Sequence, residues 1–133
     1  MKTVIIIEKG KDGTYSVYPA KGEMIIIGEG SSVEKAKDDF MNSYNEMKEY
    51  LKEKGKNMPS ELNEEHFEYK YDISSLFNEF NFINVSKFAE WLGISPSLMR
   101  HYKSGNTYIS INQVKKIEEG LHKIATQLLS VTL

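Results

Sequence analysis

Between Ile94 and Gln113 the chain carries basic, hydroxyl and amide side chains and no carboxylate. Arginine and lysine donate hydrogen bonds to guanine edges and to phosphates, and small hydroxyl groups allow a close approach to DNA. A carboxylate in such a surface would repel phosphate. The segment therefore predicts contacts with double-stranded DNA. The side chains expected to make them are Ser95, Ser97, Arg100, His101, Lys103, Asn106, Thr107 and Tyr108.

Two short helices joined by a tight turn are expected to position these side chains. Asn84 can cap the first helix, and Gly93 can adopt the positive φ that ends it. Ser95-Pro96 is a typical helix start, with serine as the cap and proline in the first turn, and Gly105 is placed to end the second helix. The expected inward contacts are Phe88, Ala89, Leu92, Ile94, Leu98, Met99 and Tyr102.

This spacing resembles the helix-turn-helix of phage-repressor-like regulators of the Xre class. That family has a small residue in the first helix, a turn glycine four residues later and an apolar residue six after that. Here these are Ala89, Gly93 and Met99. The resemblance implies that the second helix reads the major groove. An ordinary helical hairpin is the alternative, and the Ser-Pro start and the basic outer face favour the DNA-binding reading.

Composition excludes several other classes. The 133 residues include no cysteine and only three histidines, which are far apart, so neither a metal site nor a cofactor is expected. The longest apolar runs, Val4–Ile7 and Met24–Ile27, are too short for a transmembrane helix or for the apolar core of a signal peptide. We therefore expect a cytoplasmic protein without a membrane partner.

The charge is divided unevenly along the chain. Residues 1–72 hold 11 Lys/Arg and 15 Asp/Glu, a net charge of −4, whereas residues 73–133 hold 6 and 4, a net charge of +2. The difference predicts two domains, 1–72 and 73–133, with different partners. Because the second domain is only mildly basic, we expect a homodimer or a higher homo-oligomer, with two copies on a palindromic operator. An apolar stripe of Leu121, Ile124, Leu128 and Val131 is the expected interface.

The first domain is expected to be α+β. Residues 2–8, Tyr15–Tyr18 and Glu23–Ile27 predict three antiparallel strands of a meander. A capping box from Ser31 to Glu34 begins a helix that runs to about Lys54. Residues 66–73 alternate apolar and polar side chains, which predicts a fourth strand.

The second domain is expected to be all-α. Asp72 can cap a short helix that begins this domain, and a capping box from Ser110 to Gln113 starts the last helix after the helix-turn-helix.

The first domain also resembles the N-terminal domain of HicB-type antitoxins, a small degenerate ribonuclease-H-like sheet plus helix. The matching residues are Tyr15, Pro19, Gly28, Ser32, Glu34, Ala36 and Asn42. The resemblance implies an antitoxin of a type II toxin–antitoxin system. Its first domain would block a small basic HicA-like toxin that cleaves mRNA, and its second domain would repress the operon. The segment Ala20–Met24 departs from the family pattern, which usually has a small Gly-Cys-like pair before the third strand.

The residues give little support to an enzyme or to a nucleotide-binding protein. An enzyme is not expected, because a ribonuclease H site needs several carboxylates around two metals, and the first strand offers only Glu8. Gly28-Glu29-Gly30 lacks the third glycine and the lysine of a nucleotide-binding loop. The remaining alternative is a solitary DNA-binding transcriptional regulator whose first domain oligomerises or senses a small ligand.

Overall fold

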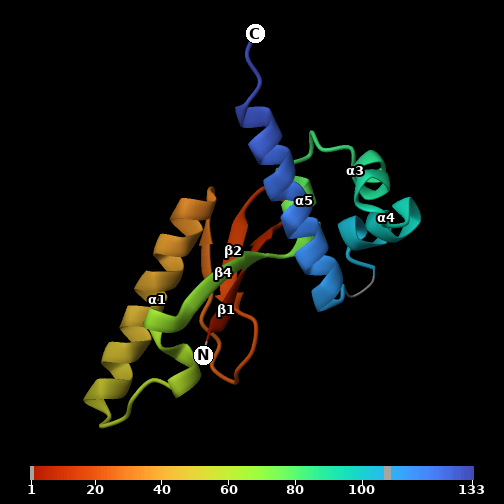
Figure 1. Cartoon of the computed structure of the whole chain (residues 1–133). Helices are drawn as coiled ribbons and strands as arrows, with labels where there is room; N and C mark the ends of the chain where they lie inside the picture. Colours follow the sequence, from red (N-terminus) through yellow and green to blue (C-terminus); the bar gives the residue numbers. More distant parts are fainter. Residues whose placement is uncertain (1, 107–108) are drawn as a thin grey trace. The chain divides into compact units, whose positions relative to one another are not determined.

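The computed structural model describes residues 2–106 and 109–133, without the side chain of Ile111. The chain divides into two compact units, Met1–Glu79 and Phe80–Leu133. Unit 1 holds a four-stranded mixed sheet with two α-helices, and unit 2 is built from three α-helices in its described part (Figure 1). The expected α+β class is therefore confirmed.

The sheet of unit 1 contains β1 (Thr3–Lys9), β2 (Tyr15–Pro19), β3 (Gly28–Gly30) and β4 (Phe67–Tyr71), in the spatial order β3-β2-β1-β4. β2 pairs antiparallel with both β1 and β3, as a meander requires. β4 pairs parallel with β1, because the chain returns through a helix before it adds this strand. The predicted order of three strands, a helix and a fourth strand is confirmed.

Helix α1 (Val33–Glu53) covers one face of the sheet (Figure 1). Ala36, Phe40 and Tyr44 recur every four residues on its inner side and are buried, as expected for an amphipathic helix. The helix begins differently from the expectation: Ser32, not Ser31, is the cap, and its side chain accepts a hydrogen bond from the amide of Lys35 at 3.1 Å. Two adjacent serines made the local pattern ambiguous.

The third strand also differs from the prediction. Residues Glu23–Ile27 lie outside the sheet, and the strand is Gly28–Gly30. A β-carbon on Gly28 would lie 2.2 Å from the backbone nitrogen of Phe40, so only glycine lets this strand pass so close to α1. The apolar run before it, which predicted a strand, leaves Ile25 80% exposed.

Helix α2 (Ile73–Glu79) begins at Asp72 as expected, since the carboxylate accepts a hydrogen bond from the Ser74 amide at 2.7 Å. The helix belongs to unit 1, however, and not to the second domain. Ser75 accepts a hydrogen bond from the Lys9 amide, and the Lys9 ammonium lies 3.4 Å from the Glu79 carboxylate. These contacts with β1 place the boundary between Glu79 and Phe80 instead of between residues 72 and 73.

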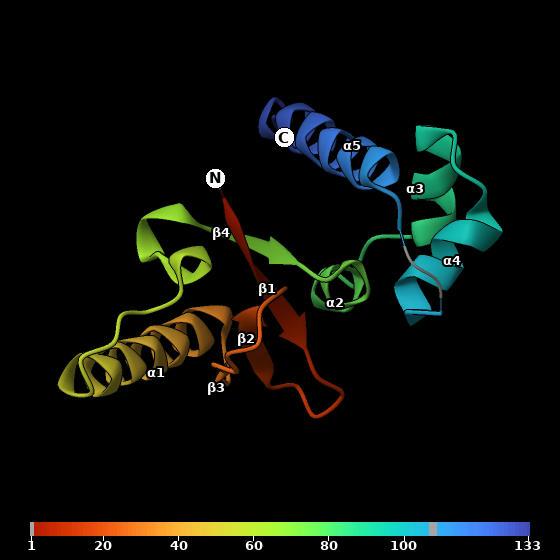
Figure 2. The ribbon, with the colours of Figure 1, turned by 90° about the horizontal axis from the view of Figure 1, so that it is seen from below.

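Unit 2 contains α3 (Val85–Leu92), α4 (Pro96–Ser104) and α5 (Ile111–Leu129), of which α3 and α4 pack side by side (Figure 2). α5 packs on α3 at Gly120, where a β-carbon would lie 2.3 Å from the Leu92 side chain. Two short 3-10 turns, Ser60–Leu62 and Glu64–His66, precede β4 in unit 1. No helix in the described part of the chain is both long and apolar enough to cross a membrane.

Candidate nucleic-acid interface

The turn between α3 and α4 is held by local hydrogen bonds at both of its ends. The Asn84 side chain caps α3 by accepting a hydrogen bond from the Lys87 amide at 3.0 Å. Gly93 ends α3 with φ 75°, which lets the Ile94 amide reach back to the Ala89 carbonyl at 2.9 Å. Two residues after Gly93, the Ser95 hydroxyl accepts a hydrogen bond from the Leu98 amide and starts α4. The two helices are thus joined by Gly93, Ile94 and Ser95 alone.

The inward side of this helix pair matches the expectation closely. Ala89 and Met99 are fully buried, and Ile94 and Tyr102 are at most 6% exposed. Ala89 is a small side chain in the buried part of α3, the helix that packs against α4. Gly105 ends α4 with φ 75°, as Gly93 ends α3. Packing and caps together fix the orientation of the outward side chains of α4.

The structure distributes the predicted DNA-contacting residues over the outside of α4 and its two ends. Ser97, Arg100 and His101 are exposed on the helix, and Lys103 is half-buried. Ser95 and Asn106 are exposed at the two ends, although the Ser95 hydroxyl already serves as the cap of α4. The two remaining predicted residues, Thr107 and Tyr108, lie outside the described residues.

Arg100 is tied to the preceding helix. Its Nη1 donates a hydrogen bond to the Ser86 hydroxyl at 3.0 Å. A guanidinium has five N–H donors, so one bond to the protein orients the planar group and leaves donors for a base edge or a phosphate. Ser86 thus positions a predicted contact residue. Sequence reasoning missed it, because the pair is 14 residues apart and no local pattern links the two side chains.

Further basic side chains belong to the same unit. With the boundary after Glu79, residues 80–133 hold 6 Lys/Arg and 3 Asp/Glu, a net charge of +3. Lys87 is exposed on α3, and Lys115 and Lys116 are exposed in the first turns of α5. The Lys116 ammonium lies 3.7 Å from the position of a β-carbon on Gly93, so it reaches the turn before α4. Sequence reasoning missed these three lysines, although their place beside two helix caps is visible in the sequence.

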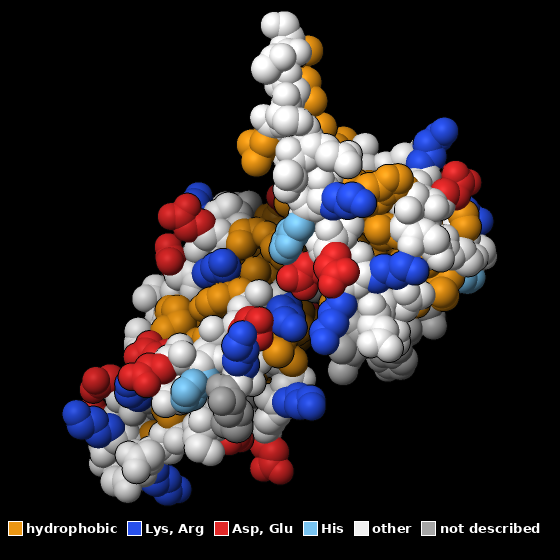
Figure 3. All heavy atoms as spheres, in the orientation of Figure 1, with side chains coloured by type: hydrophobic (Ala, Val, Ile, Leu, Met, Phe, Trp, Pro, Cys, Tyr) orange, Lys and Arg blue, Asp and Glu red, His pale blue; other side chains and the backbone are white. Residues whose placement is uncertain are grey.

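Burial decreases along α5 toward the C-terminal end of the predicted interface stripe. Ile117 and Gly120 are buried against the rest of unit 2, and Leu121 and Ile124 are half-exposed. Leu128 is 64% exposed, and Val131 lies beyond the end of the helix and is 58% exposed. Figure 3 shows apolar side chains along this C-terminal end of the chain. The stripe thus continues past the part that unit 2 covers.

Comparisons with known proteins found no counterpart for the chain: no family model, no curated protein and no solved structure matches it. Among the described residues, no three His, Asp or Glu side chains lie close enough together to hold a metal ion.

Proposed function

We propose that the protein is a cytoplasmic antitoxin of the HicB type, which binds operator DNA through a helix-turn-helix in unit 2 and neutralises a small basic, mRNA-cleaving toxin through unit 1. The observation that carries the DNA-binding half is the helix pair α3–α4. It combines a three-residue turn, a buried small residue at Ala89 and an exposed second helix that bears Ser97, Arg100 and His101. A helix of this kind enters the major groove, with its first turn near the bases.

The charge of unit 2 supports DNA binding but only a modest affinity. A net charge of +3 neutralises few phosphates, and one short helix reads only a few base pairs. Two copies, with their second helices about 34–36 Å apart, would double both contributions. We therefore propose a homodimer, formed through the exposed apolar end of α5.

DNA binding is tested with the full chain and a duplex selected by it from a random library. We expect Arg100→Ala to weaken binding to that duplex by roughly 1–3 kcal/mol and to relax the preference at one base pair. Lys11→Ala, which removes the same charge from an exposed position in unit 1, is the matched control and should bind as the unaltered chain does.

Fluorescence anisotropy at two salt concentrations gives the readout. Equal weakening on every duplex would make Arg100 a phosphate contact. If the full chain prefers no duplex even at low salt, the helix-turn-helix proposal is wrong.

The antitoxin half of the proposal is supported by the architecture and charge of unit 1. A small sheet with one covering helix, in the order of three strands, a helix and a strand, is what the resemblance to HicB-type antitoxins implies. Residues 1–79 hold 11 Lys/Arg and 16 Asp/Glu, a net charge of −5. An acidic surface attracts a basic ribonuclease at long range and competes with RNA for it.

Co-expression tests this half. The proposal predicts a short reading frame for a basic protein beside this one. That frame is induced alone and together with the full chain, and growth is followed. We expect arrest in the first case and rescue in the second, with rescue retained in the Arg100→Ala chain because unit 1 is unchanged. A neighbouring product that does not arrest growth would leave the solitary DNA-binding regulator as the better reading.

A further inference from the structure

Helix α1 carries charged side chains of both signs. Two of its lysines lie toward the β4 side of unit 1, and both have partners there. The Lys37 ammonium lies 4.6 Å from the centre of the Tyr69 ring, and the Lys48 ammonium lies 3.8 Å from the Glu64 carboxylate. These contacts connect α1 to β4 and to the turn before it, so folding accounts for the two lysines.

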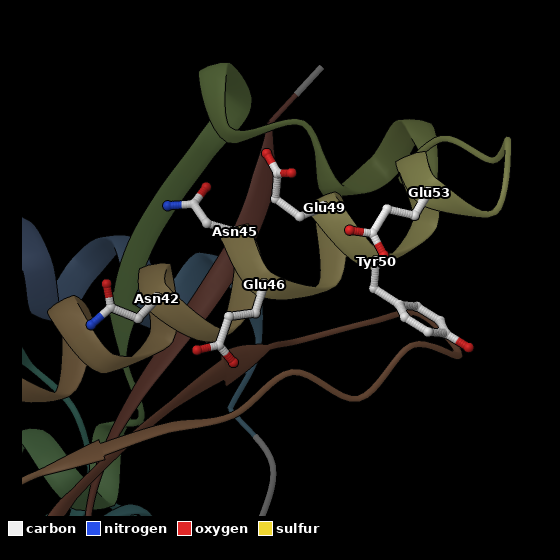
Figure 4. Close-up of a pocket in the computed structure, with 6 residues that line it drawn as sticks. All are labelled: Asn42, Asn45, Glu46, Glu49, Tyr50 and Glu53. Atoms are coloured by element: carbon white, nitrogen blue, oxygen red, sulfur yellow. The ribbon is translucent and has the colours of Figure 1, made fainter.

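Three glutamates of α1 have no such explanation. Glu46, Glu49 and Glu53 are spaced by three and four residues, so they share one side of the helix (Figure 4). In the described structure none of the three carboxylates makes an ion pair or hydrogen bond. Like charges at this spacing destabilise a helix, and Glu53 lies in the last turn, where the helix dipole also disfavours a carboxylate. Folding alone therefore does not explain this stripe.

An apolar hollow lies beside the glutamates. In the segment before β3, Ile26 is buried, whereas Ile25 and Ile27 point outward and are 80% and 48% exposed. Across from them, Met47 and Tyr50 of α1 complete a shallow groove of about 370 Å³, and Tyr50 is 55% exposed. Single exposed apolar residues are ordinary on a protein surface, but a contiguous group with a polar rim is typical of an interaction site.

We propose that this acidic groove, defined by Ile25, Ile27, Glu46, Met47, Glu49, Tyr50 and Glu53, is the surface on which unit 1 binds the basic protein it neutralises. The inference rests on the proposed antitoxin function and adds the place and chemistry of the contact. The occupant is a protein segment whose aliphatic side chains fill the groove between Ile25 and Tyr50. Its flanking lysines or arginines pair with the three unpaired glutamates.

Other occupants fit this surface less well. Nucleic acid and anionic lipid would bring phosphates against the glutamates. A second copy of the chain, related by a twofold axis, would bring the same glutamates together. Addition of a strand at β3 is also disfavoured, because the Glu29 amide of this edge strand is already occupied by the Asp39 carboxylate at 2.8 Å. A basic protein that binds through its side chains is therefore the occupant that fits this surface best.

The test uses the full chain and the purified product of the short neighbouring reading frame that the antitoxin proposal predicts. Two variants alter the acidic groove: Ile25→Lys removes an apolar contact, and the double variant Glu46→Lys/Glu49→Lys reverses two charges of the stripe. We expect each to weaken binding by roughly tenfold or more. For the double variant much of the loss should lie in the association rate and shrink at high salt.

Matched controls separate the groove from general effects. Phe82→Lys alters a side chain that is 81% exposed, like Ile25, and Glu61→Lys/Glu65→Lys makes the same charge change at exposed positions before β4. Circular dichroism confirms that all four proteins are folded. If the unaltered chain does not bind the neighbouring product, the antitoxin proposal fails and the groove assignment with it. If it binds and the groove variants bind no worse than their controls, only the groove assignment fails.

Discussion

The contact between β3 and α1 can be tested by adding a single methyl group. In Gly28→Ala the new β-carbon would lie 2.2 Å from the backbone nitrogen of Phe40 and 2.5 Å from the carbonyl oxygen of Ala36. Both atoms belong to the backbone of a helix, so no side-chain rotation relieves the clash. The φ of Gly28 is not in the left-handed region, so alanine suffers there from lack of space and not from backbone strain.

The size of the effect follows from these distances. Ordinary contacts need about 3.4 Å or more, so β3 must move away from α1 by roughly 1 Å. That movement opens the contact over Ala36 and Phe40, both of which are fully buried. Overpacking of a buried site costs about 1–3 kcal/mol and occasionally more. Alanine also lowers the conformational entropy of the unfolded chain relative to glycine, but this stabilises the folded state by less than about 1 kcal/mol. We expect the free energy of unfolding to fall by roughly 3 kcal/mol.

Urea denaturation followed by circular dichroism measures this change. Gly30→Ala should cost less, because its closest contacts are 2.7–2.8 Å, and Glu29→Ala should cost least, because this side chain is exposed and its amide bond to Asp39 is retained. If Gly28→Ala unfolds within about 0.5 kcal/mol of the unaltered chain, or if Glu29→Ala is equally damaging, the close packing of β3 on α1 is refuted.

Two further predictions concern pH and association. Burial raises the pKa of Tyr18 above its ordinary value of 10.0, and so does the 2.7 Å hydrogen bond that the Tyr18 hydroxyl donates to Glu8. The folded state therefore disfavours the phenolate. The protonated Tyr18 contributes stability below pH 10, and this contribution is lost as the pH rises further. In Tyr18→Phe the melting temperature should therefore fall less steeply above pH 10, and an unchanged slope would contradict this linkage. Leu128→Lys places a charge on a side chain that is 64% exposed at the end of α5, and sedimentation at micromolar concentration should show a monomer, whereas the neighbouring exposed change Gln127→Lys should leave the proposed dimer intact.

The elements of unit 2 could be predicted from the sequence because their limits are set locally. Asn84 and Ser95 bond to amides three residues away, and Gly93 ends its helix through bonds to the preceding turn. Such signals lie within a few residues of each other, so they can be recognised in the sequence without knowledge of the fold. The Arg100–Ser86 bond connects two helices and could not be read from spacing.

Unit 1 was harder to predict because distant contacts decide its details. The apolar run Met24–Ile27 has the composition of a strand, but the sheet uses Gly28–Gly30 instead, because glycine alone fits against Phe40. The parallel pairing of β4 with β1 and the attachment of α2 through Lys9 likewise depend on residues far apart in the chain. The acidic stripe of Glu46, Glu49 and Glu53, by contrast, is a local pattern that the sequence shows at helical spacing, although it was not among the predicted sites.

The parallel pairing of β1 with β4 has a consequence for synthesis on the ribosome. β1 lies between β2 and β4, yet residues 20–66 must be made after β2 before β4 can follow. At about 5–20 residues per second, this interval lasts roughly 2–10 s. During it the isoleucine-rich strand β1 has one unpaired edge, and exposed edges of this composition are sites of aggregation. The nascent chain therefore passes through a stage in which a strand that later lies inside the sheet is open to aggregation.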